Sequence, residues 1–72
     1  MRAKVYLIPK AAILPILRGE KRVANIPTNA ECVAADSGVM GFGLRVHCDS
    51  FDDVPFGKQL PLVPAVIERR AE

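Results

Sequence analysis

The chain has 72 residues, half of them apolar, and a net charge of +2. This length excludes more than one domain, residues 1–72, and a domain so small buries only about 60% of the surface of its unfolded chain. Because the apolar side chains outnumber the interior sites that such a domain offers, we expect some of them to be covered by another subunit. No apolar stretch is long enough to span a bilayer, so we expect no membrane partner.

The N-terminal part of the chain predicts a strand followed by a short helix. Residues 3–8 alternate and are rich in β-branched and aromatic side chains, which is typical of a strand. Residues 10–18 carry apolar side chains at helical spacing, and Gly19 stands where a helix often ends. Pro15 is compatible with this helix if the first turn begins near Ala12, and otherwise kinks it.

The clearest periodic signal lies in residues 31–48 and predicts a β-hairpin. Asp36-Ser37-Gly38 has the composition of a turn, so we expect the chain to reverse there. After the turn every second residue is apolar, which predicts an inward-facing row: Met40, Phe42, Leu44, Val46 and Cys48. The residues between them, among which are Arg45 and His47, should face away from the core.

The two cysteines are expected to be free thiols in the core. With the chain reversing at residues 36–38, Cys48 lies opposite Ile26 or Pro27, and Cys32 lies roughly 17 to 20 Å away along the ladder. A disulfide requires Cα atoms within about 7 Å. Free thiols suit a reducing compartment, and prolines interrupt the only stretch that resembles a signal peptide, so we expect a cytoplasmic protein.

The C-terminal part predicts an acidic loop and one more element. In the loop, residues 49–58, Phe51, Val54 and Phe56 are expected to cover the core. Residues 60–69 contain Pro61 and Pro64, so a strand there must be an edge strand. A helix beginning at Pro64 is the alternative, and the sequence leaves open whether residues 62–70 are strand or helix.

Together these elements predict an α+β fold, in which a small antiparallel sheet is built in the order strand, helix, hairpin, strand, with the short helix packed on one face. Part of the sequence, Leu17 to Val33 together with Asp49 to Pro55 and Gly57, resembles small uncharacterised bacterial and phage proteins. The resemblance implies the same order of elements. It implies no activity and no functional residue, and Ala35, Gly41 and Gly43 depart from the pattern.

Two groups of residues are candidates for binding. The small residues Gly41 and Gly43 allow a close approach of another backbone, which predicts a partner-packing face. The N-terminal third holds six basic residues against one acidic residue, which predicts a possible anion or nucleic-acid patch of Arg2, Lys4, Arg18, Lys21 and Arg22.

The sequence offers no catalytic, cofactor or metal site. His47 and Cys48 are adjacent in a predicted strand and point to opposite faces, so they cannot converge on one ion. Asp49, Asp52 and Asp53 lack the spacing of a calcium loop. We therefore expect a small protein-interaction or self-association module that is not an enzyme, most simply a homodimer. The alternative is a nucleic-acid-binding accessory protein that uses the basic cluster.

Overall fold

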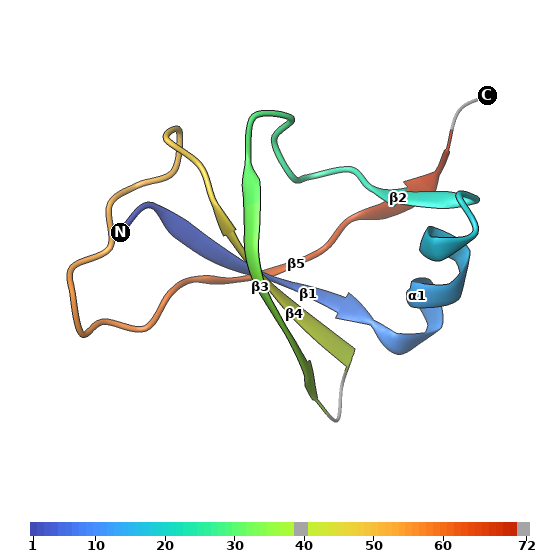
Figure 1. The fold of residues 1–72 in the computed structure, drawn as a ribbon, viewed down its shortest axis with the longest axis horizontal. Coiled ribbons are helices and arrows are strands. Elements are labelled where there is room, and N and C mark those ends of the chain that lie inside the picture. Colours follow the sequence, from blue (N-terminus) through green and yellow to red (C-terminus); the bar gives the residue numbers. More distant parts are fainter. Residues whose placement is uncertain (39–40, 71–72) are drawn as a thin grey trace.

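The computed structural model describes residues 1–38 and 41–70, and it confirms an α+β fold (Figure 1). The chain begins with a strand that leads directly into the helix, as the sequence predicts. The elements in chain order are β1 (Ala3–Pro9), α1 (Lys10–Leu17), β2 (Lys21–Val23), β3 (Glu31–Gly38), β4 (Gly41–His47), β5 (Leu62–Pro64) and β6 (Ile67–Arg69).

Four of the strands form one twisted sheet in the order β3, β4, β1, β5. The pairs β3–β4 and β4–β1 are antiparallel, but β5 runs parallel to β1. The sheet is therefore mixed, which corrects the prediction of an antiparallel sheet. The parallel pairing arises because the long segment after β4 carries the chain back to the start of β1. Strands β2 and β6 form a separate antiparallel ribbon.

The four strands stack along the shortest dimension of the molecule. The described chain measures 38 × 28 × 16 Å, and three spacings between four paired strands account for about 14 Å. Figure 1 looks along this stack, with β3 crossing in front of the other strands. The two broad sides of the molecule are therefore the two edges of the sheet.

A small core lies on one side of the sheet, which we call the inner face. Tyr6 and Val46 from the central strands pack there with Phe51 and Cys48 from the segment after β4. The hydroxyl of Tyr6 donates a hydrogen bond to the backbone oxygen of Asn25 at 3.0 Å, which ties the connector after β2 to this face. Burial of this phenol raises its pKa.

The helix lies at the end of the sheet, where it contacts β1 and β2 (Figure 1). It begins at Lys10, two residues earlier than the start that best suits Pro15, which is therefore inside the helix. Gly19 adopts a φ of +79° and its N–H bonds to the oxygen of Ile16, so the predicted glycine end is confirmed. Leu14 and Leu17 remain exposed.

The hairpin is confirmed, but its register differs from the predicted one. Gly38 pairs with Gly41, so the predicted reversal at residues 36–38 is wrong. Met40, which was expected in the inward-facing row, lies outside the described residues. Asp36 and Ser37 remain extended because each has a partner in β4. Glu31 therefore faces His47, and Cys48 lies beyond the ladder rather than opposite Ile26 or Pro27.

The predicted faces of β4 are correct. Val46 is buried, Leu44 and Phe42 are partly buried on the inner face, and Arg45 is exposed. Both cysteines are free, as expected. Cys48 is buried but Cys32 is exposed, which corrects the prediction of two core thiols, because β3 is an edge strand with little covering it.

The C-terminal segment is extended, so the helix alternative is wrong. It divides into β5, an edge strand beside β1, and β6, which pairs with β2. The side chain of Asn25 stabilises the break between them: its amide nitrogen donates to the oxygen of Pro64 and its oxygen accepts from the N–H of Val66. In the preceding loop Phe51 covers the core as predicted, whereas Phe56 is fully exposed.

Candidate interaction surface

Strand β3 presents an open edge of the sheet. One side of its backbone pairs with β4, and no other described segment pairs with the opposite side. Seven of its eight residues are exposed, and Val33 keeps 40% of its accessible surface. An edge of this kind carries unpaired N–H and C=O groups that can accept another strand. A register irregularity between Cys32 and Ala34 and the exposed charges of Glu31 and Asp36 restrict how a strand can pair with this edge.

The opposite edge of the sheet is protected. Strand β5 has only three residues, and it lies between Pro61 and Ala65. Pro61 and Pro64 have no N–H to offer an incoming strand. Edge strands that are short and contain proline resist pairing with another chain. The two edges are therefore unequal, and β3 is the one suited to accept a partner.

The exposed area of the chain is larger than that of a compact monomer. The chain exposes 5440 Å², whereas a monomeric protein of 7.8 kDa exposes roughly 4,400 Å². Its radius of gyration is 12.6 Å, compared with roughly 11 Å for a compact chain of this length. The excess of about 1,000 Å² is similar to the area of about 800 Å² that one partner buries in a stable complex.

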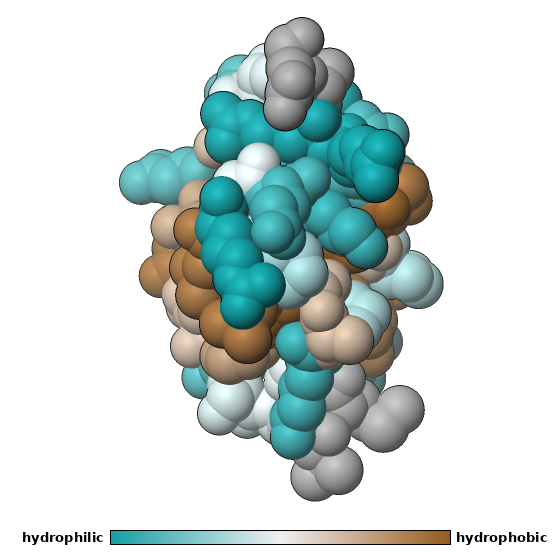
Figure 2. Space-filling view, turned by 90° about the vertical axis from the view of Figure 1, so that its right-hand side faces the viewer, coloured by the Kyte–Doolittle hydropathy of each residue, from teal (hydrophilic) through white to brown (hydrophobic). Residues whose placement is uncertain are grey.

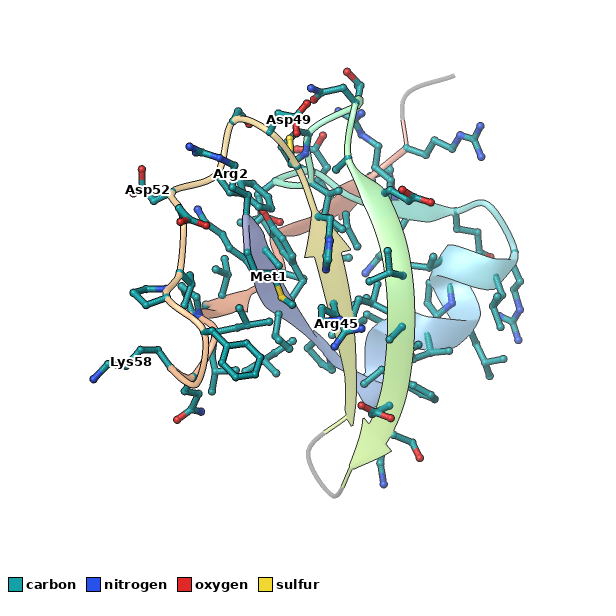
Figure 3. The ribbon with its side chains drawn as sticks, turned by 60° about the vertical axis from the view of Figure 1, so that its left-hand side comes forward. Met1, Arg2, Arg45, Asp49, Asp52 and Lys58 are labelled. Atoms are coloured by element: carbon teal, nitrogen blue, oxygen red, sulfur yellow. The ribbon has the colours of Figure 1, made fainter. Side chains whose placement is uncertain are left out.

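The face of the sheet opposite the core, which we call the outer face, holds charged residues near the β3 edge, among them Asp36 and Arg45. Asp36 on β3 is opposite Gly43, and Arg45 on β4 is opposite Ala34. Both charged side chains are exposed, and among the described residues neither takes part in an ion pair. Figure 3 views the molecule toward this face, with Arg45 in front of the strands.

The two glycines predicted to pack against a partner have different surroundings. A Cβ at Gly41 would lie 2.1 Å from the oxygen of Ile8, so the space beside Gly41 is filled by the chain itself. Gly43 lies in a hollow of about 370 Å³ on the outer face, whose apolar wall includes Val5 and Leu62. Gly43 therefore remains a candidate contact, whereas Gly41 is explained by packing within the chain.

The five predicted basic residues do not form one patch. Arg2 and Lys4 lie at the start of β1, where Arg2 donates to the backbone oxygen of Phe51 and the Lys4 ammonium lies 4.6 Å from the Phe51 ring centroid. Arg18, Lys21 and Arg22 lie beyond the other end of β1, a strand of seven residues that spans about 20 Å.

A separate basic patch surrounds the β2–β6 ribbon. Lys21 is directly opposite Arg69, and the backbone N–H of Arg70 bonds to the oxygen of Glu20. We call Arg18, Lys21, Arg69 and Arg70 the ribbon patch. In Figure 2 hydrophilic side chains gather at this end of the molecule, above hydrophobic ones. Sequence analysis missed the two C-terminal arginines because only the ribbon brings them beside Lys21.

Neither His47 and Cys48 nor the aspartates of residues 49–53 form a metal site in the structure. Among the described residues no three His, Cys, Asp or Glu side chains are placed to hold a metal ion. Cys48 is within hydrogen-bonding distance of Ser50, with 3.0 Å between Sγ and Oγ, which suits a structural thiol. Nε2 of His47 is buried and has no hydrogen-bond partner among the described residues.

The carboxylate of Asp53 forms an ion pair with the Met1 ammonium beside the start of β1. It accepts a hydrogen bond of 2.6 Å from the Met1 ammonium, and this bond and the nearby positive charge lower the pKa of Asp53 from its ordinary 3.8. Because the pKa is lowered in the folded state, the stabilisation is present above about pH 4 and is lost as the pH falls through the folded pKa.

We expect Asp53→Asn to remove this pH dependence. Native and variant chains should differ in stability at pH 6 and converge as the solution is made acidic, which urea unfolding at a series of pH values measures. An equal difference in stability at every pH would contradict the assignment.

Comparison with known proteins returns no match among family models, curated proteins or solved structures. In the part of the chain that the structure describes, no helix has both the length and the apolar character needed to cross a membrane.

Proposed function

We propose that this chain is a protein-interaction module without catalytic activity, and that it self-associates as a homodimer through the edge of β3. Edge-to-edge pairing would extend the four-stranded sheet into an eight-stranded one across two copies. The observation that carries the proposal is the unequal protection of the two edges. Strand β5 is short, follows Pro61 and contains Pro64, whereas β3 is long, exposed and free of proline and lysine.

The shape of the molecule supports the same partner. Each copy is thin along the direction in which the strands stack, 16 Å against 38 and 28 Å, and pairing at β3 adds the second copy along this direction. The excess exposed area is also of the size that one subunit buries in a stable dimer. Most soluble oligomers are homo-oligomers with two-fold symmetry, so a second copy is the simplest partner.

Light scattering coupled to size exclusion tests the proposal in the native chain and two variants. We expect the native chain to have twice the mass of the 7.8 kDa monomer at high micromolar concentration. Val33→Lys places a charge on the β3 edge and should give monomers, because lysine on an edge strand blocks pairing.

Leu62→Lys is the matched control, since Leu62 is similarly exposed, at 55%, on the opposite edge. This variant should remain dimeric. A monomeric native chain, or a dimer that dissociates only when Leu62 is changed, would contradict the proposal.

A second function, binding to the phosphate backbone of nucleic acid, is favoured by one observation. Lys21 and Arg69 are directly opposite in the ribbon, and like charges in this position repel unless an anion lies between them. Binding through the ribbon patch would weaken steeply with salt, and Arg69→Ala should lower the salt dependence by about one released counterion. No measurable affinity for DNA or RNA at low salt would remove this candidate.

A further inference from the structure

We infer that the two β3 strands pair antiparallel with Ala35 facing its own copy across the two-fold axis, and that Arg45 of each copy pairs with the partner's Asp36. This inference rests on the proposed self-association and specifies its register. It follows from the positions of the charged residues along β3 and from the small side chains between them.

The acidic residues of β3 exclude several registers. Antiparallel pairing of two identical strands is defined by the residue, or the residue pair, on the symmetry axis. An axis at Asp36 would place two carboxylates directly opposite each other. An axis between Val33 and Ala34 would place Glu31 opposite the partner's Asp36, and like charges directly opposite destabilise a sheet.

An axis at Ala35 avoids both conflicts. Asp36 then lies opposite the partner's Ala34, and Ser37 lies opposite the partner's Val33. This register places residues 34–36 of each copy, which pair in regular order with β4, at the centre of the contact. The irregularity then lies toward the two ends of the contact, where Ser37 meets the partner's Val33.

The same register brings opposite charges together on the outer face. Arg45 is opposite Ala34 within its own chain, so in this register Ala34 separates Arg45 from the partner's Asp36. The two backbones are then two strand spacings apart, about 10 Å. A long arginine side chain can lie across the alanine methyl group and meet the shorter carboxylate side chain approaching from the other strand. The two-fold axis repeats this ion pair.

Other features of the chain agree with an ion pair between copies. Arg45 and Asp36 are both exposed, and among the described residues neither is neutralised within its own chain. Leaving them unpaired at an interface would cost free energy, whereas reciprocal pairing fixes the register. The arrangement is self-complementary, as a two-fold interface must be.

Charge exchange tests the ion pair in the full chain. Arg45→Asp and Asp36→Arg should each raise the Kd of the dimer about tenfold or more, because each change places two like-charge contacts in the interface. The double variant R45D/D36R should return the Kd to within about threefold of the native value. Additive weakening in the double variant would overturn the ion pair.

Cysteine crosslinking tests the register directly. In a chain carrying Cys32→Ser, Ala35→Cys would face its own copy at a Cα separation of about 4.5 to 5.5 Å, which suits a disulfide. With oxidised glutathione as the oxidant, we expect a covalent dimer. Ser37→Cys in the same background is the matched control: it lies on the same side of β3 but about 13 Å from its own copy, so it should remain uncrosslinked.

The outcomes separate this inference from the proposed function. A native chain that is dimeric, with crosslinking at Ala35→Cys and rescue by the double charge exchange, supports both. A native dimer that crosslinks through Ser37→Cys instead overturns the register and leaves self-association standing. A native chain that is monomeric by light scattering overturns both.

Discussion

Phe51→Ala is expected to leave much of the chain unfolded at 25 °C. Phe51 is 6% exposed and completes the core with Tyr6, at 6.4 Å between ring centroids. Removing a buried phenylalanine side chain costs about 3 to 5 kcal/mol. A domain of this size has a total stability of roughly 4 to 11 kcal/mol, so the loss is a large part of what is available.

Urea unfolding monitored by circular dichroism measures this effect, and the loop supplies its own control. Phe56 is five residues away and fully exposed, so Phe56→Ala should change the free energy of unfolding by less than about 0.5 kcal/mol. Both variants must be compared at one protein concentration, because the proposed self-association would stabilise the folded chain. Equal effects of the two substitutions would show that the core is not where the structure has it.

Gly41→Ala is expected to have the second-largest effect. Gly41 adopts a φ of +138°, and an added Cβ would lie 2.1 Å from the backbone oxygen of Ile8. The unfavourable backbone conformation alone costs about 1 to 3 kcal/mol. The contact adds to this cost because the oxygen belongs to β1 at the centre of the sheet and cannot move without breaking the pairing of β1 with β4.

Gly57→Ala separates these two contributions. Gly57 also has a positive φ, +87°, but no atom lies within 4 Å of an added Cβ. Gly57→Ala should therefore lower the free energy of unfolding by about 1 kcal/mol, the cost of the unfavourable backbone conformation alone. We expect Gly41→Ala to cause a clearly larger loss in thermal or urea unfolding. A smaller loss at Gly41 than at Gly57 would contradict the close approach of β1 and β4.

Local sequence patterns predicted the elements that are defined by the spacing of their own side chains. The alternation in residues 3–8 and after residue 40 correctly indicated strands, and the inward row of β4 includes Val46 as expected. Gly19 marked the end of α1 because a positive φ at that point favours glycine. These features depend on short-range geometry, which composition and spacing record.

Pairings between distant segments could not be predicted from the same patterns. Asp36-Ser37-Gly38 has the composition of a turn, yet it remains extended because its residues pair with β4. The division of the C-terminal segment depends on Asn25, whose side chain bonds to the backbone on both sides of the break. The ribbon patch depends in turn on that division, because β6 places Arg69 opposite Lys21.

The open edge of β3 was also beyond sequence analysis. A strand becomes an edge strand through the order of its sheet, and the order β3, β4, β1, β5 depends on where the last segment returns. The apolar composition predicted exposed apolar surface, and the structure leaves several large apolar side chains exposed, Leu17 and Phe56 among them.

The central proposal is that a second copy pairs with β3, and nuclear Overhauser effects between isotopically distinct copies test it most directly. In a mixture of labelled and unlabelled chains, the account predicts intermolecular contacts between backbone protons of residues 33–37 of one copy and those of the other. Backbone protons of directly paired strands lie close enough together to give these effects. Intermolecular contacts confined to β5 or α1, or their complete absence at concentrations where the native mass is measured, would contradict the account.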